Sequence, residues 1–142
     1  MSQTELVGPL TREEILRQIP EWKPLVQAYS PDLDIVARLQ KIHEEINVEI
    51  FLGTWCPDCR RHVSAYFKIM DMVANPLVTT TLTGIPRDRG AREKYIAGRD
   101  IERVPTIIVS FRGREIGRIV ETPEVSVEAD LWRIIEPSVG SR

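Results

Sequence analysis

The sequence lacks the features that mark several large classes of protein. No run approaches the roughly 18 apolar residues of a membrane-spanning helix, and the first thirty residues have no basic-then-apolar secretion signal. Nineteen basic residues against 21 acidic ones leave a net charge of -2. That balance argues against a protein that binds nucleic acid or anionic membranes through its charge. We therefore expect a cytoplasmic protein with neither nucleic acid nor membrane as a partner.

Cysteine is scarce as well, and the two that occur, Cys56 and Cys59, are three positions apart. A structural disulfide rarely persists in the cytoplasm, so such a pair is better suited to catalysis, redox exchange or metal binding. A chain of 142 residues buries enough surface to form a core without a disulfide or a metal. The pair is therefore the most informative feature of the sequence.

The spacing of apolar residues predicts a helical first third and a mixed core. Residues 1–46 are expected to form a helical N-terminal extension, because apolar side chains recur there at helical intervals. Ser30 is the expected N-cap of its third helix, with Pro31 at the first helical position. After residue 46 the pattern alternates between strand and helix. The expected strands are 48–52, 77–82, 106–111 and 115–120, and the expected helices are 57–74, 91–97 and 124–136.

This order predicts an α/β protein with a central mixed sheet of at least four strands flanked by helices. No internal repeat, low-complexity tract or linker divides the chain. We therefore expect one domain over residues 1–142, in which 47–136 form the core.

The position of the cysteine pair suits thiol–disulfide exchange. Cys56 follows a buried strand and precedes a helix, so it is expected at the helix N-cap, where unpaired N–H groups and the helix dipole favour a thiolate. Pro57 fits the first helical position. Cys59 lies one turn later on the same face and is expected to be more buried, while Trp55 shields the pair from water. Exchange needs such an attacking thiolate and a second thiol to resolve the mixed disulfide.

The pair also admits two other interpretations. The cysteines could act as small apolar core residues, or Cys56, Cys59 and His62 could bind zinc with His43 as the fourth ligand. There is no second C-x-x-C, and His43 is expected on a different helix, so no metal site is predicted. The basic stretch at 86–118 is interpreted as a solvated surface with interspersed acids, partner binding being the alternative.

Two motifs resemble the thioredoxin superfamily over residues 47–136. The segment FLGTWCPDC at 51–59 is similar to the family strand that ends in Trp-Cys-x-x-Cys, and Val104-Pro105-Thr106 is similar to its cis-proline motif. The resemblance implies a thioredoxin-like fold, with Cys56 as nucleophile, Cys59 as resolving cysteine and Pro105 in cis beside the disulfide. The substrate-binding residues that it implies are Trp55, Pro57, Asp58, Val104, Pro105 and Thr106.

The sequence departs from the thioredoxin pattern at several positions. Pro57-Asp58 replaces the common Gly-Pro between the cysteines, as in a subgroup of thioredoxin-related proteins. Ile50 stands where thioredoxins have a buried aspartate that helps to deprotonate the resolving thiol. Ser64 replaces the usual helix proline, and no first strand is evident before residue 47.

The resemblance implies a cytoplasmic thiol–disulfide oxidoreductase working in the reducing direction, without a bound cofactor. Its substrate would be a protein or small-molecule disulfide, and its electrons would come from a reductase or a thiol pool. The alternative, favoured by Ile50, is a thioredoxin-like binding module that holds a partner without turnover.

Overall fold

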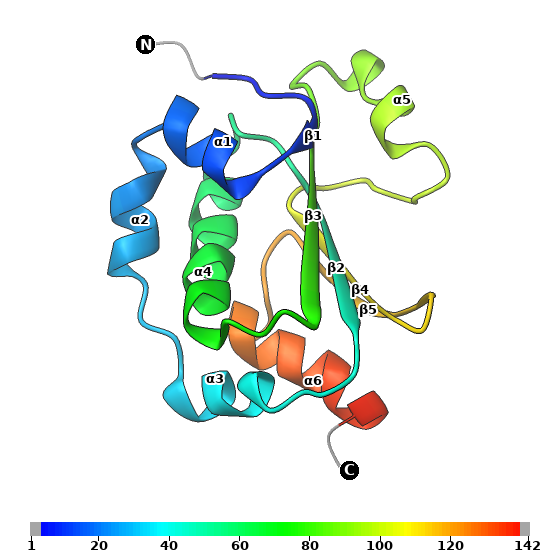
Figure 1. Ribbon diagram of the computed structural model, residues 1–142. Coiled ribbons are helices and arrows are strands. Elements are labelled where there is room, and N and C mark those ends of the chain that lie inside the picture. Colours follow the sequence, from blue (N-terminus) through cyan, green and yellow to red (C-terminus); the bar gives the residue numbers. More distant parts are fainter. Residues whose placement is uncertain (1–3, 140–142) are drawn as a thin grey trace.

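The protein is built on a five-stranded mixed sheet with strand order β1-β3-β2-β4-β5 (Figure 1). The computed structural model describes residues 4–139, so the ends of the expected domain, 1–3 and 140–142, lie outside the described residues. β2 and β3 are parallel, and all other neighbouring strands are antiparallel. The strands are β1 (Gly8–Leu10), β2 (Ile46–Leu52), β3 (Val78–Gly84), β4 (Thr106–Phe111) and β5 (Arg114–Val120). The α/β fold class with a mixed sheet flanked by helices is confirmed.

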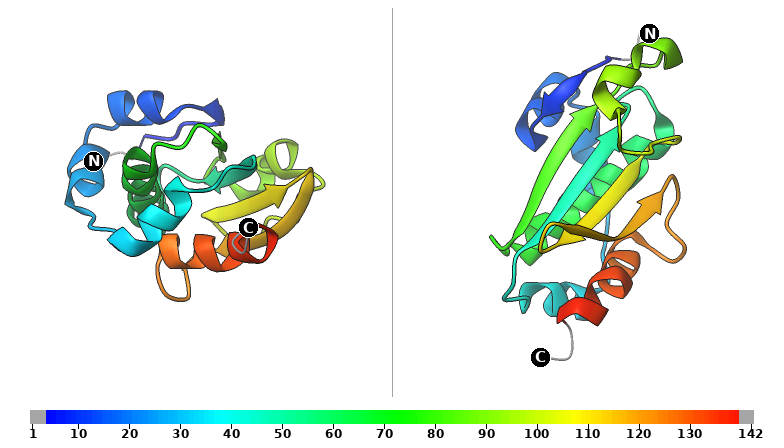
Figure 2. Two further views of the ribbon diagram at one scale, coloured as in Figure 1. Left: turned by 60° about the horizontal axis from the view of Figure 1, so that its bottom comes forward. Right: turned by 90° about the vertical axis from the view of Figure 1, so that its right-hand side faces the viewer.

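Two helices cover one face of this sheet. α4 (Pro57–Val73) connects the parallel strands β2 and β3, and α6 (Val127–Val139) packs beside it against β4 and β5. The right-hand view of Figure 2 shows the sheet from its other side, with α4 behind it and α6 at its lower end. Ile46, Val48 and Ile50 of β2 are fully buried. Such an apolar run is typical of a central strand, because it must pack against helices rather than water.

The N-terminal helices lie outside α4 on the same side of the sheet (Figure 1). They are α1 (Arg12–Gln18), α2 (Trp22–Ala28) and α3 (Leu33–Gln40). The fully buried Trp22 of α2 packs against Phe67 of α4, with ring centroids 6.2 Å apart. Lys68 of α4 donates to the carbonyl of Gln27 at 3.0 Å. The segment is thus packed onto the core and shares its hydrophobic cluster.

The expectation of a purely helical N-terminal extension is wrong at one place, because the segment also contributes the edge strand β1. Gly8 pairs with Gly84, and Leu10 pairs with Leu82. The strand has three residues, one of them Pro9, which a strand tolerates at the sheet edge. Gly84 is required, since a Cβ there would collide with the backbone carbonyl of Leu6. This strand brings the sheet to five strands.

Helix boundaries also differ from the predicted ones. The third helix begins at Leu33, and its N-cap is Asp32 instead of Ser30, because the Asp32 carboxylate accepts from the N–H groups of Asp34 and Ile35. A carboxylate accepts both hydrogen bonds at the cap, and it also suits the positive end of the helix.

The two later helices shift for similar local reasons. The helix predicted at 91–97 is divided into η1 (Arg89–Ala91), a 3-10 turn, and the four-residue α5 (Glu93–Ile96). The last helix begins at Val127, because the Ser126 hydroxyl accepts from the N–H of Ala129 and caps it there. Both differences lie at element ends, which sequence patterns define least well.

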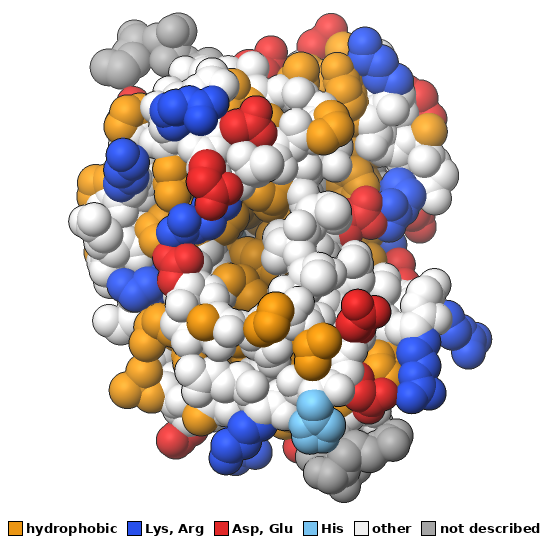
Figure 3. Space-filling model, viewed as in Figure 1, with side chains coloured by type: hydrophobic (Ala, Val, Ile, Leu, Met, Phe, Trp, Pro, Cys, Tyr) orange, Lys and Arg blue, Asp and Glu red, His pale blue; other side chains and the backbone are white. Residues whose placement is uncertain are grey.

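A cleft of about 290 Å³ opens between α4 and β3 beneath α1. Figure 3 shows a hollow with hydrophobic side chains on its floor. The residues that line the cleft include Phe67 and Met70 of α4. Within residues 4–139 no helix is both long and apolar enough to cross a bilayer.

Candidate active site at the start of helix α4

Cys56 is the N-cap of α4, as the sequence predicts, and Pro57 follows at the first helical position. A turn closed by the Cys56 N–H and the Gly53 carbonyl, 3.0 Å apart, leads from β2 into the helix. Proline suits this position because its missing N–H would have no helical partner. The thiol therefore stands at the helix end where N–H groups are unpaired.

The pKa of Cys56 is lowered to about 6, chiefly because the Cys59 thiol can donate a hydrogen bond to its thiolate. Partial burial opposes this effect, and the N–H groups of Cys59 and Asp58 lower the pKa further. Because an unperturbed thiol titrates well above neutral pH, the shift makes Cys56 largely a thiolate at pH 7. The thiolate is the nucleophilic form.

The pKa of Cys59 is shifted in the opposite direction. Its side chain is fully buried, and the Gly53 N–H donates to its sulfur at 3.3 Å. Burial first, and the neighbouring Cys56 second, raise the pKa of Cys59 far above its ordinary value. The two thiols are both free. Their environments thus separate one accessible thiolate from one buried thiol, which attack and resolution require.

Asp58 lies between the cysteines and acts on both of them. Its negative charge raises the pKa of Cys56 and of Cys59, although other causes are larger. Its carboxylate pairs with Arg61 at 2.5 Å. Ile50 and Ser64, two other positions at which the sequence departs from the thioredoxin pattern, are both fully buried.

Trp55 is held by contacts that the sequence pattern did not predict. Its Nε1–H donates to the Ile85 carbonyl at 3.0 Å, and the guanidinium carbons of Arg87 and Arg92 each lie 5.3 Å from its ring centroid. Gly53 leaves room for the ring, because a Cβ there would collide with it. In the sequence, the arginine-rich stretch at 86–118 was the available signal for these contacts with Trp55. Its pattern did not indicate which residues the arginines would contact.

Val104 and Pro105 reach the cysteines from the loop before β4. The Val104–Pro105 peptide bond is cis. The Cys56 sulfur lies 3.9 Å from the Val104 carbonyl oxygen. The buried Thr106 donates its hydroxyl to the Arg103 carbonyl at 2.5 Å, so this hydroxyl holds the loop. The structure thus brings Cys56 beside Val104, while Thr106 supports the loop from within.

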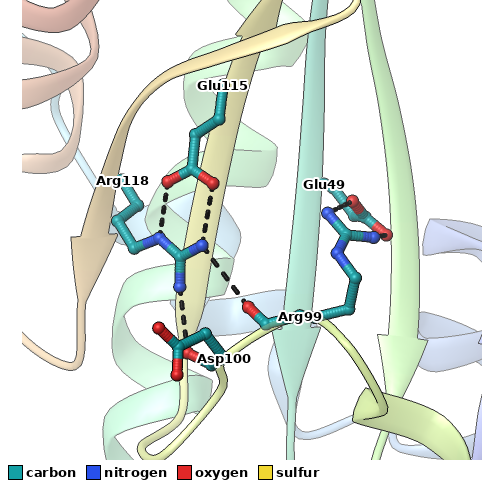
Figure 4. Close-up of polar contacts among 5 residues, drawn as sticks. All are labelled: Glu49, Arg99, Asp100, Glu115 and Arg118. Atoms are coloured by element: carbon teal, nitrogen blue, oxygen red, sulfur yellow. Dashed lines mark hydrogen bonds and ion pairs between the residues drawn. The ribbon is translucent and has the colours of Figure 1, made fainter.

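A polar cluster on the outer face of the sheet holds the segment that precedes Val104 in place (Figure 4). Arg118 of β5 binds Glu115 through two hydrogen bonds and donates to the carbonyls of Asp100 and Arg99. Arg99 in turn pairs with Glu49 of β2. These contacts fix the chain four residues before Val104, and they act on the candidate site through the backbone.

The alternative zinc ligands are not assembled. Across residues 4–139 no three or more His, Cys, Asp or Glu side chains are grouped so that they could hold a metal ion. His62 lies on α4 near Arg61, where burial and that arginine lower its pKa. His43 is exposed beyond the end of α3.

Comparison with known proteins gives a likeness of fold alone. No model of a known protein family matches the sequence, and no curated protein matches it. Two solved structures each have a TM-score of 0.64 at 17% identity, with 88% of this chain and 86% of the other covered: a protein of unknown function from Pseudomonas aeruginosa and an HIV epitope-scaffold. The germline-specific thioredoxin Deadhead from Drosophila melanogaster has a TM-score of 0.45 at 16% identity, over 75% of this chain and 93% of its own.

Proposed function

We propose that the protein is a thioredoxin-like thiol–disulfide oxidoreductase that reduces protein or small-molecule disulfides. The observation that carries this proposal is the contrast between the cysteines: Cys56 has a pKa of about 6 at a helix N-cap, and Cys59 is buried one turn later. Trp55 and Val104 flank the reactive thiol. The cytoplasm, where thiols are kept reduced, is the compartment in which such a dithiol is usable.

In the first step the Cys56 thiolate attacks one sulfur of the substrate disulfide. A bond forms between that sulfur and the sulfur of Cys56, while the substrate S–S bond breaks and its electron pair leaves with the other sulfur as a thiolate. The substrate chain would lie beside the carbonyl of Val104, whose oxygen is 3.9 Å from the Cys56 sulfur.

In the second step Cys59 loses its proton to water or to Asp58 and attacks the sulfur of Cys56. The mixed disulfide breaks, the second substrate thiolate leaves, and Cys56 and Cys59 are left oxidised to a disulfide. Two electrons have passed to the substrate. A thiol of the cytoplasmic pool or a disulfide reductase must return them, and the scheme needs no bound cofactor.

Insulin reduction with dithiothreitol as electron donor tests the proposal. The wild-type protein is expected to accelerate precipitation of the insulin B chain, whereas Cys56→Ser is expected to be inactive. Cys59→Ser is expected to accumulate as a mixed disulfide, which mass spectrometry detects and which would also identify partners.

The alternative is a binding module without turnover, which Ile50 at the position of the thioredoxin aspartate favours. If wild type and Cys56→Ser precipitate insulin at the same rate, the oxidoreductase proposal is wrong. If that result is accompanied by stable, cysteine-independent capture of a partner, the binding module is the better description.

A further inference from the structure

A mostly apolar groove of about 470 Å³ adjoins the cysteine motif. It lies between the C-terminal half of α2 and the first turn of α4, and we call it the α2–α4 groove. Its lining residues are Leu25, Ala28, Tyr29, Pro57, Arg60 and Arg61. Pro57 directly follows the nucleophilic Cys56, so the groove is continuous with the surface that a substrate disulfide must approach.

The wall at Tyr29 is fixed by a buried carboxylate. The Tyr29 hydroxyl donates to Glu128 of α6 at 2.6 Å, and the Asp32 N–H donates to the other oxygen of the same carboxylate at 2.8 Å. Glu128 is only 3% exposed. Because these hydrogen bonds hold the end of α2 against α6, the groove is formed before any partner binds, and its ordering adds no cost at binding.

Leu25 presents apolar surface to this groove. Its side chain is 43% exposed, although most large apolar residues of the described chain are buried. An isolated exposed leucine needs no explanation. Here, however, it borders a concave apolar surface next to the reactive thiol, where an apolar side chain of a partner would bury it.

Arg60 gives the groove a positive edge. Its Nε–H lies 3.4 Å from the Thr54 carbonyl, and none of the carboxylates in residues 4–139 forms an ion pair with it. Arg61 is already paired with Asp58. The unpaired guanidinium of Arg60 is therefore the group available to an acidic residue of a partner.

We propose that the α2–α4 groove binds an apolar side chain, next to an acidic residue, in the protein substrate whose disulfide Cys56 attacks. This inference rests on the proposed function and names the substrate class for the same site. Pro57 lines the groove and directly follows Cys56, and an extended chain advances about 3.3 Å per residue. The proposal therefore places the apolar residue within about three positions of the attacked cysteine. The N-terminal helices thereby select the substrate.

Peptide mixed disulfides test the selection. Each synthetic peptide carries one cysteine joined to 5-thio-2-nitrobenzoate, whose release reports attack by Cys56, and has Leu or Ser within three positions of the cysteine. Wild type is expected to prefer the best Leu peptide over its Ser counterpart by about tenfold in the second-order rate constant of thionitrobenzoate release from a single turnover. In Leu25→Ser this preference is expected to fall to about twofold or less. Leu33→Ser, an equally simple change at an exposed leucine of α3 outside the groove, is expected to retain it.

A second pair of peptides tests the charge. An Asp beside the Leu is expected to improve the single-turnover rate constant several-fold over Asn, and Arg60→Gln or added salt is expected to remove that gain. Equal rates for the Leu and Ser peptides with active wild-type protein would overturn the groove proposal.

A binding measurement separates failure of this inference from failure of the oxidoreductase proposal. The same peptides with serine in place of cysteine are titrated by fluorescence anisotropy, which needs no redox activity. Preferential binding of the Leu peptide without release of thionitrobenzoate from any peptide would retain the groove and reject the oxidoreductase. Thionitrobenzoate release that shows no preference for the Leu peptide, in binding or in rate, would retain the oxidoreductase proposal and reject the groove proposal.

Discussion

At the scale of single residues, the proposed chemistry depends on the different environments of two identical side chains. Cys56 has a lowered pKa because Cys59 and backbone N–H groups face it, and Cys59 has a raised pKa because it is buried. One thiol is thus ionised at neutral pH while the other keeps its proton. The consequences can be measured one residue at a time.

Alkylation of native protein is expected to distinguish the two thiols. With a pKa of about 6, Cys56 should react with iodoacetamide at a rate that rises with pH and reaches half its maximum near pH 6, because only the thiolate reacts. Cys59 should remain unlabelled until the protein unfolds. Mass spectrometry of labelled peptides measures both rates, and equal rates near neutral pH would refute the assignment. In Cys59→Ala the midpoint should move to higher pH, because the largest cause of the shift is removed.

Asp58 is expected to tune the reduction potential. Its charge raises the pKa of Cys56 and so disfavours the thiolate of the reduced form. Asp58→Asn should therefore make the potential less negative by at most about 30 mV, which is the equivalent of one full pKa unit, and should slow resolution of the mixed disulfide. We expect the wild-type potential nearer to about -270 mV than to about -120 mV. Equilibration in glutathione buffers measures it, and a wild-type value above about -180 mV would contradict the reducing direction.

At the scale of elements, helix α4 contains one polar group that its packing does not satisfy. The Ser64 hydroxyl is buried without a hydrogen-bond partner among the described residues. Ser64→Ala should raise the free energy of unfolding by about 1 kcal/mol, since it removes the buried hydroxyl and favours the helix. Urea unfolding at constant m-value measures the change. Destabilisation would show that the hydroxyl is satisfied in solution.

The N-terminal helices are tied to α6 through Glu128. Glu128→Ala should lower the free energy of unfolding by about 2–4 kcal/mol, because the Tyr29 hydroxyl and the Asp32 N–H lose their buried acceptor. Glu136→Ala, at an exposed position of the same helix, should change it by less than about 0.5 kcal/mol. Chemical denaturation of both variants gives the comparison, and equal stabilities would show that the carboxylate does not anchor the segment.

At the scale of the whole molecule, the sequence predicts those features that periodicity and local chemistry determine. β4 has the predicted bounds, and Cys56 lies at the predicted N-cap, because a buried strand and a proline-led helix leave clear local patterns. The contacts of Arg92 with Trp55 and of Tyr29 with Glu128 were not predicted. Each joins residues far apart in the chain, and no local pattern records such a pairing. The α2–α4 groove was missed for the same reason.

The edge strand β1 was missed because it is short and contains glycine and proline, and its place in the sheet has a consequence for synthesis. Gly8 pairs with Gly84, so β1 has no partner strand during synthesis until β3 has also left the ribosome. Contacts over such a separation also form slowly, because closing a long loop precedes any gain. β1 therefore remains unpaired while the central strands and α4 are synthesised. Among the five strands of this sheet, β1 comes earliest in the chain and yet can pair only after β3 has been made.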